Sequence, residues 1–174
     1  VDDGCSSAVK KIKTLAEFEA FCKLIFRTTE EFDTQAAETL HIKPKEEFPQ
    51  KQVILVEELI SRKNAVHFLE ITGGMLTKLN EKGEIEYEVF EASEALADGE
   101  ILSLEEKFLA GQGQNITPAR YAKDAKDRQK VSNQVKAALG GAAKALGVTG
   151  YCRIDAFVRV FDDYRAEIIF IEVN

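Results

Sequence analysis

The chain has 174 residues, of which 45% are hydrophobic and 30% charged, and its formal net charge is −7. This size suffices for one well-buried core or two small lobes, and no uncharged apolar run is long enough for a membrane span or a signal peptide. The acidic balance argues against a nucleic-acid partner, because phosphate backbones bind basic surfaces. We therefore expect a soluble, cytoplasmic protein that binds neither nucleic acid nor membrane.

Cysteine and histidine residues are scarce. The three cysteines stand at unrelated spacings, which favours reduced thiols over a disulfide framework. With only His41 and His67 available, a zinc site of the Cys/His kind is disfavoured, so we expect any metal to be held by oxygen. The chain begins without methionine and stops on a strand-like stretch, so we expect a piece of a longer protein.

The first third of the chain predicts one capped helix and then an irregular segment. Thr14 and Glu17 have the spacing of a capping box, and the apolar residues that follow recur at helical spacing. Residues 28–50 are highly charged, contain Pro44 and Pro49, and show weak periodicity. We expect them to be irregular, with room for one short helix, and we interpret them as a candidate insertion.

The middle of the chain predicts strands. The sequence VILVEELI at 53–60 has the pattern of a buried strand that runs into a polar turn. Residues 65–92 have the pattern of strands separated by Gly73-Gly74 and by the turn NEKGE at 80–84. This order favours an antiparallel meander.

The last third predicts a helix and a strand pair. Residues 126–146 carry an apolar stripe at helical spacing, and Gly147 is a typical helix stop. Strands at 150–161 and 166–173 follow, joined by DDYR at 162–165. The stripe consists of Val131, Val135, Ala138, Leu139, Ala142, Ala143 and Leu146.

Two acidic side chains are predicted to face each other across this strand pair. Side chains alternate faces along a strand, so a symmetric four-residue loop at 162–165 places Asp155 opposite Glu172 and Arg153 opposite Asn174. Facing carboxylates repel, so we expect a raised pKa on one acid, a counter-charge from Arg153, or a divalent cation between the two. Alternatively, both acids are solvated residues at strand ends that bind nothing.

Asn174 makes the cation a specific hypothesis. Its side chain offers a neutral oxygen just beyond Glu172, and Mg²⁺ usually takes one or two carboxylates together with phosphates and water. The set of Asp155, Glu172 and Asn174 suits that preference.

Three other stretches carry candidate binding residues. The loop DDGCSSAVKK at 2–11 can bring backbone N–H groups and the Ser6 or Ser7 hydroxyls against a phosphate, or it is a polar turn before the helix. Lys107 precedes a Gly/Gln segment and suits a lid over an anionic substrate, or it is a solvated lysine. Glu57 and Glu58 are either surface acids or part of a linker whose backbone reads a purine edge.

In this order, the motifs resemble the ATP-grasp superfamily, and within it the D-alanine–D-alanine ligase family. The resemblance covers nearly the whole chain apart from the region near 28–50. Four stretches carry it: the phosphate loop and helix DDGCSSAVKKIKTLAEFEAF, the adenine strand and hinge VILVEELI, the lysine loop EEKFLAGQGQNITPA, and the metal strands GVTGYCRIDAF and IIFIEVN.

The resemblance implies an α+β, ATP-grasp fold, with antiparallel sheets and packed helices around a nucleotide cleft. We accordingly predict that residues 1–174 form a single ATP-grasp module from a longer ligase.

The resemblance also implies roles for individual residues. Asp155, Glu172 and Asn174 would bind Mg²⁺, or Mn²⁺ in its place, bridging the phosphates of ATP. Arg153 would stabilise the developing oxyanion, and Lys107 would contact the transferring phosphoryl group. Further contacts to ATP are implied for Gly4, Cys5, Ser6 and Ser7 in the phosphate loop, for Glu57, Glu58, Leu59 and Ile60 at the adenine, and for Asn64 near the ribose.

The implied activity is ATP-dependent ligation of a carboxylate to an amine. ATP phosphorylates the carboxylate, and an amine attacks the acyl phosphate to give an amide, ADP and phosphate. We predict D-alanine–D-alanine ligation, as in peptidoglycan biosynthesis, with ATP and small amino acids as partners. The full-length chain is compatible with a homodimer, and this piece alone is expected to be inactive. Two alternatives remain: an ATP-grasp ligase with other amino acid or peptide substrates, and a non-catalytic ATP-binding regulatory domain.

Three positions depart from the family pattern. Cys5 stands where the family has the first loop serine, Asn64 stands near where an acid binds the ribose hydroxyls, and Phe108 replaces the tyrosine after the lysine. These departures bear on the choice of substrate more than on the nucleotide site.

Overall fold

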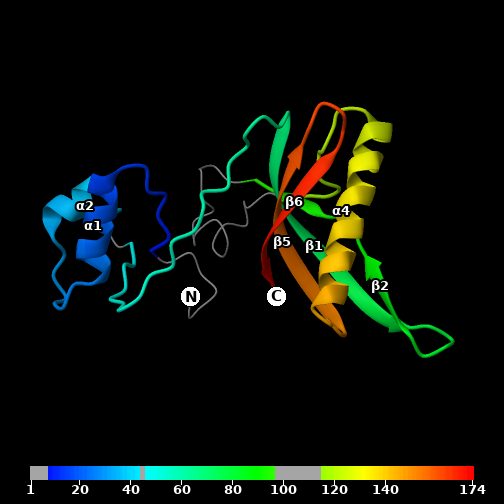
Figure 1. The fold of residues 1–174 in the computed structure, drawn as a ribbon, viewed down its shortest axis with the longest axis horizontal. Helices are drawn as coiled ribbons and strands as arrows, with labels where there is room; N and C mark the ends of the chain where they lie inside the picture. Colours follow the sequence, from blue (N-terminus) through cyan, green and yellow to red (C-terminus); the bar gives the residue numbers. More distant parts are fainter. Residues whose placement is uncertain (1–7, 44–45, 97–114) are drawn as a thin grey trace. The chain divides into compact units, whose positions relative to one another are not determined.

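The computed structural model of the chain describes residues 8–43, 46–96 and 115–174 (Figure 1). The described residues divide into two compact units, one of residues 8–43 and 46–59 and one of residues 60–96 and 115–174. The prediction of a single ATP-grasp module over 1–174 stays a prediction.

The first unit holds two helices around a small core. Helix α1 (Leu15–Ile25) begins after Thr14, which exchanges hydrogen bonds with Glu17, so the predicted capping box is confirmed. Helix α2 (Thr34–Thr39) is a short helix within the otherwise irregular segment at 28–50. Buried apolar side chains of both helices pack with Phe48, which closes the core of this unit.

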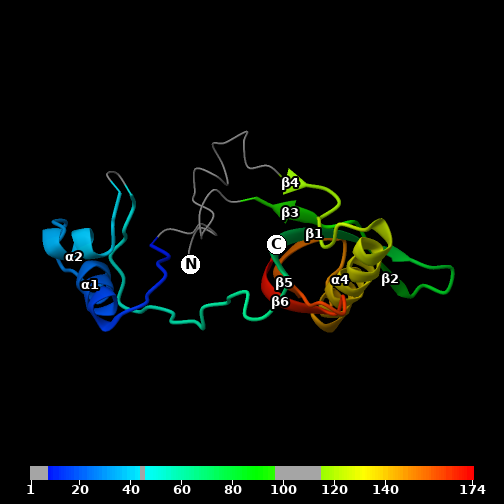
Figure 2. The same ribbon diagram turned by 90° about the horizontal axis from the view of Figure 1, so that it is seen from above.

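The second unit is an antiparallel sheet with one long helix, α4 (Ala125–Ala145), on one face (Figures 1 and 2). The six strands of the described residues are β1 (His67–Leu79), β2 (Ile85–Val89), β3 (Ser93–Ala95), β4 (Asn115–Ile116), β5 (Tyr151–Val160) and β6 (Ala166–Val173). The strand order is β4-β3-β1-β5-β6, and β2 pairs with the far end of β1. The predicted α+β class, with an antiparallel sheet and packed helices, is confirmed.

The core of the second unit lies between α4 and the sheet. Every second residue of β5, from Cys152 to Val160, is buried under the helix, so the residues between them face the opposite side. The predicted apolar stripe of α4 supplies the matching side chains. Leu146 departs from the prediction, because it is the C-cap of the helix and is 65% exposed. The buried residues of α4 are Val131, Ser132, Val135, Leu139 and Ala143.

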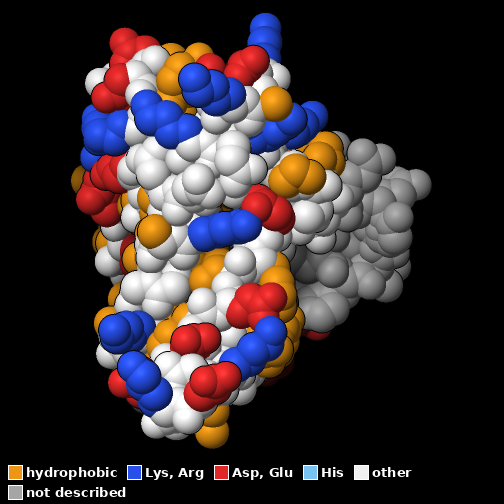
Figure 3. Space-filling model, turned by 90° about the vertical axis from the view of Figure 1, so that its right-hand side faces the viewer, with side chains coloured by type: hydrophobic (Ala, Val, Ile, Leu, Met, Phe, Trp, Pro, Cys, Tyr) orange, Lys and Arg blue, Asp and Glu red, His pale blue; other side chains and the backbone are white. Residues whose placement is uncertain are grey.

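Charged side chains of both signs are interspersed on the face of the molecule shown in Figure 3. Neither sign forms a continuous patch on the side seen there. In the second unit, Lys78 pairs with Glu88 across β1 and β2, and Lys136 of α4 pairs with Glu91. Opposite charges therefore neutralise one another locally along the sheet and the helix.

Residues 53–60 do not form the predicted buried strand. Val53, Leu55 and Val56 are 81%, 78% and 71% exposed, and no strand ladder of the described residues includes this segment. An apolar run becomes a strand only where a neighbouring strand can pair with its backbone. The apolar pattern of VILVEELI indicated burial, but it carries no information about a pairing strand. The prediction of a buried strand at 53–60 was therefore wrong.

Gly73 and Gly74 do not separate two strands, as predicted, because β1 runs through both and pairs there with Ile154 and Arg153 of β5. A Cβ atom at Gly73 would lie 2.4 Å from Cδ1 of Leu139. Any side chain at position 73 would therefore have to displace the end of the Leu139 side chain of α4. The predicted turn at 80–84 is confirmed by the β1–β2 hairpin.

This packing predicts opposite effects for alanine at two glycines. Gly73→Ala forces Leu139 to move inside a packed core and should lower the free energy of unfolding by about 1–3 kcal/mol. The matched change Gly141→Ala, inside α4 with open space around the new Cβ, should raise it by roughly 0.5–1 kcal/mol. Urea unfolding of both variants tests this. Equal effects of the two changes would contradict the close approach of helix and strand.

Candidate functional site

Strands β5 and β6 bring four predicted site residues together. Asp155 lies opposite Glu172, and Arg153 and Asn174 exchange two backbone hydrogen bonds of 2.8 Å. Since Ile154 is fully buried under α4, its neighbours on β5 and their cross-strand partners belong to the other face of the sheet. The predicted opposition of the two acids is therefore observed, whereas their role stays a prediction.

The hairpin loop that joins the two strands is shorter than predicted. Phe161 N–H donates to the Arg165 carbonyl at 3.0 Å, which leaves a loop of residues 162–164 in place of a symmetric four-residue loop. Tyr164 has a φ of 58°, as expected for a three-residue hairpin loop that ends in the left-handed region. The predicted loop was wrong by one residue.

A β-bulge in β6 restores the pairing. The register set by the loop pairs Ala156 with Phe170, and it would next place Asp155 opposite Ile171. The register shifts at this point, so Ile171 becomes the extra residue and Glu172 comes opposite Asp155. The bulge thus turns the Glu172 side chain to the face that carries Asp155.

The Asp155 carboxylate is held by donors from three side chains. Oδ1 accepts from the Thr72 hydroxyl at 2.6 Å and from Arg153 Nε at 3.1 Å. Oδ2 accepts from Arg153 Nη2 at 2.9 Å and from Asn174 Nδ2 at 3.4 Å. Arg153 is therefore the counter-charge for Asp155. A counter-charge from Arg153 was one of the three predicted ways to offset the repulsion between the facing acids.

Glu172 is in the opposite situation. It is half-buried, and within the part of the chain that the structure describes its carboxylate has no hydrogen bond or ion pair. The described residues hold no group of three or more His, Cys, Asp and Glu that could bind a metal ion. The oxygens of Asp155, Glu172 and Asn174, if completed by water and phosphate, would be a donor set that fits Mg²⁺.

Thr72 is a site residue that the sequence pattern did not indicate. It lies directly opposite Asp155 on β1, so its hydroxyl meets the carboxylate across neighbouring strands. The contact joins residues 83 positions apart in sequence. Only the register between β1 and β5 could have revealed it, and the interpretation of Gly73-Gly74 as a break concealed that register.

The other predicted site residues lie elsewhere. Glu57, Glu58 and Leu59 are exposed at the end of the first unit, whereas Ile60 and Asn64 belong to the segment that leads into β1. Asn64 is exposed on a turn there. Five further residues fall outside the described residues, namely Gly4, Cys5, Ser6, Ser7 and Lys107.

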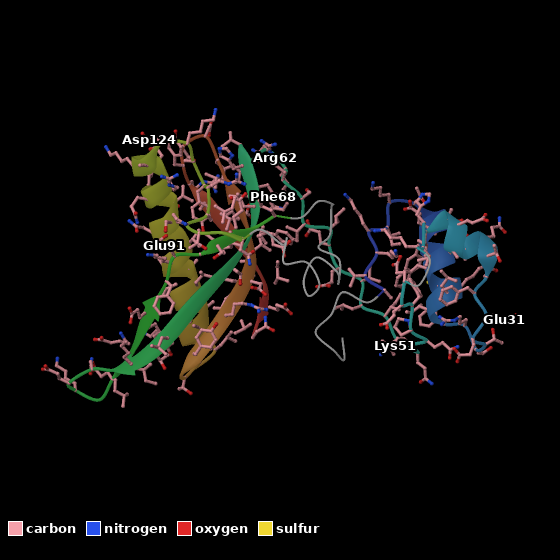
Figure 4. All side chains as sticks on the ribbon, turned by 180° about the vertical axis from the view of Figure 1, so that it is seen from behind. Glu31, Lys51, Arg62, Phe68, Glu91 and Asp124 are labelled. Carbon is pink, nitrogen blue, oxygen red and sulfur yellow. The ribbon has the colours of Figure 1, made fainter. Side chains whose placement is uncertain are left out.

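A separate pocket of about 360 Å³ lies at the first residues of β1, where Figure 4 shows Arg62 and Phe68. Its acid, Glu94, is buried and paired with Arg120, whose Nε and Nη2 donate at 2.8 and 3.0 Å. These hydrogen bonds hold the pKa of Glu94 below its usual value, against the opposing effect of burial. The pocket is lined by Arg62, Val66, His67, Phe68, Leu69, Glu94 and Arg120.

Comparison with protein families identifies the chain. The family model described as the C-terminus of D-Ala–D-Ala ligase matches residues 32–174. The chain belongs to this family. Membership confirms the resemblance to the ATP-grasp superfamily and to the C-terminal part of its D-alanine–D-alanine ligases. The match includes most of the segment at 28–50, whose interpretation as an insertion stays a prediction.

Two further comparisons add little to this assignment. Comparison with curated proteins gives no match. Among solved structures, the chain is similar to that of the ADP complex of PurK, N5-carboxyaminoimidazole ribonucleotide synthetase, with 20% identity and a TM-score of 0.39. The alignment covers 61% of this chain and 22% of that chain, so this chain spans about a fifth of the other protein's length. Within the described part of this chain, no helix is both long enough and apolar enough to cross a bilayer.

The Glu94–Arg120 pair predicts a pH-dependent contribution to stability. Because the pKa of Glu94 is lowered in the folded state, its contribution is present above the ordinary glutamate pKa of about 4.3 and is lost as the pH falls through the lowered value. Glu94→Gln should cost about 1–3 kcal/mol of unfolding free energy at pH 7 and progressively less below pH 4.

Urea unfolding between pH 3 and pH 7 measures this difference. The control is Glu81→Gln, at an exposed position in the β1–β2 turn. A difference between Glu94→Gln and the unsubstituted protein that stays constant over this range would contradict the ion pair.

Proposed function

We propose that this chain is the nucleotide- and metal-binding part of an ATP-dependent carboxylate–amine ligase of the D-alanine–D-alanine ligase type. Family membership supports ATP-dependent ligation as its chemistry. The observation that carries the proposal is the meeting of Asp155 and Glu172 on one face of the sheet, beside Arg153 and Asn174.

The charges of this site suit phosphoryl transfer to a carboxylate. Such a transfer brings two anions together, so its barrier is largely electrostatic. A bound Mg²⁺ ion would neutralise the phosphates, and Asp155, Glu172 and Asn174 are the residues that we propose to hold it. Arg153 would stabilise the oxyanion that develops, and Lys107 would contact the transferred phosphoryl group.

The contacts to the rest of ATP are proposed from the family resemblance. Gly4, Cys5, Ser6 and Ser7 would close over the phosphates, and Asn64 would lie near the ribose. Residues 57–60 would hold the adenine, and the side chain of Leu59, which is 52% exposed, is compatible with a surface that a ligand covers. We expect no turnover by this chain alone, because the chemistry requires groups from a whole ligase.

ADP release by the full-length protein tests the proposal. Release that D-alanine stimulates, in the presence of Mg²⁺, supports D-alanine–D-alanine ligation. Stimulation only by another amino acid or a peptide would assign the protein to a different ATP-grasp ligase activity. ATP binding without turnover would indicate a non-catalytic nucleotide-binding domain and would overturn the proposed ligase.

Substitution of the facing acids gives a sharper prediction. Asp155→Asn and Glu172→Gln each remove a charged oxygen ligand with little change in shape, so each should lower the rate of ADP release by at least about 100-fold. The control Glu81→Gln, an exposed acid in the β1–β2 turn, should keep the full rate. Rates are compared under saturating ATP and Mg²⁺. Near-normal turnover of Glu172→Gln would exclude the proposed metal role.

A further inference from the structure

The Asp155 carboxylate has no free acceptor position. Each carboxylate oxygen offers two lone-pair directions. On Oδ1 these meet the Thr72 hydroxyl and Arg153 Nε, and on Oδ2 they meet Arg153 Nη2 and Asn174 Nδ2. A cation that binds Asp155 must therefore displace a donor that is already there.

The three donor side chains differ in how readily they can leave. Thr72 is β-branched, lies on the central strand β1 and donates at 2.6 Å, so its side chain is the most constrained. Asn174 donates at 3.4 Å, the longest of the contacts, and its amide can turn to present oxygen instead. Arg153 blocks both carboxylate oxygens at once, and its long side chain is 47% exposed.

We propose that Arg153 is an exchangeable counter-ion of Asp155. In the metal-free protein its guanidinium neutralises the carboxylate, and it is released when a divalent cation takes its place. Thr72 keeps its hydrogen bond to Oδ1 and holds the carboxylate in position during the exchange. The inference rests on the proposed function, because it assigns an order to that site: the cation binds first, and only then is Arg153 free to face substrate.

Charge balance favours this exchange. Asp155 and Glu172 lie opposite each other, and Arg153 neutralises only one of them while Glu172 has no partner among the described residues. A divalent cation neutralises both acids together and makes the arginine unnecessary as a counter-charge. The released guanidinium keeps its full set of donors, which suits an anionic group on the substrate.

Mn²⁺ binding to the full-length protein, measured by electron paramagnetic resonance, tests the exchange without any turnover. Arg153→Lys keeps the positive charge and removes the two-pronged contact to Asp155. If the contact competes with the cation, this variant should bind Mn²⁺ at least about threefold more tightly than the unsubstituted protein. The control Arg165→Met, at the exposed residue that follows the hairpin loop at the other end of the strand pair, should leave the affinity unchanged.

The outcomes separate this inference from the proposed function. If Arg153 affected the cation only through charge repulsion, Arg153→Lys would leave the Mn²⁺ affinity unchanged, because the charge is kept. An unchanged or weaker Mn²⁺ affinity would therefore overturn the exchange and leave the proposed function standing. An absence of Mn²⁺ binding by the unsubstituted protein would overturn both the exchange and the proposed metal site.

A second measurement uses no substitution in the protein observed. The Nε–H signal of Arg153 in a ¹⁵N spectrum, assigned by its loss in Arg153→Lys, should move when Mg²⁺ saturates the protein. A signal that stays at the same position at saturating Mg²⁺ would show that the guanidinium remains on Asp155 and would overturn the exchange.

Discussion

The repulsion between two facing carboxylates is the constraint on which the candidate site of the second unit depends. Asp155 and Glu172 occupy opposed positions on neighbouring strands, where like charges normally destabilise a sheet. The two acids differ in their hydrogen bonds. Asp155 accepts from the side chains of Thr72, Arg153 and Asn174, whereas Glu172 has no donor in the described part of the chain. This asymmetry leaves one carboxylate open, which is what a site for a hard cation needs.

The scaffold explains how such a site can be rigid. Strand β1 lies at the centre of the sheet, pairs with β5 over ten residues and presents Thr72 to Asp155. Helix α4 packs against the opposite face so closely that Gly73, the residue next to Thr72, cannot carry a side chain without displacing Leu139. The polar face is therefore supported directly behind by the packed core. The position of Asp155 depends on β1 as much as on its own strand.

Local patterns in the sequence predicted the parts of this fold that local interactions decide. The capping box at Thr14, the helix ended by Gly147 and the alternation along β5 each depend on neighbours within a few residues, and all three are observed. The strand predicted at 53–60 failed because pairing needs a partner that the segment itself cannot specify.

In the candidate site, too, local sequence predicted some features, whereas others depend on long-range pairing. The opposition of Asp155 and Glu172 was predicted with the wrong loop, and the observed pairing depends on a bulge at Ile171 that compensates for a shorter turn. The strand pattern does not predict a bulge, because Ile171 is apolar like the three residues before it. The Thr72 contact likewise depends on long-range register, which periodicity along one strand does not contain.

The most direct test of the central claim is the anomalous diffraction of Mn²⁺ in crystals of the full-length protein grown with ADP. The account predicts a manganese peak within about 2.0–2.6 Å of carboxylate oxygens from both Asp155 and Glu172. A nucleotide bound in well-ordered crystals with no manganese peak between these two side chains would contradict it.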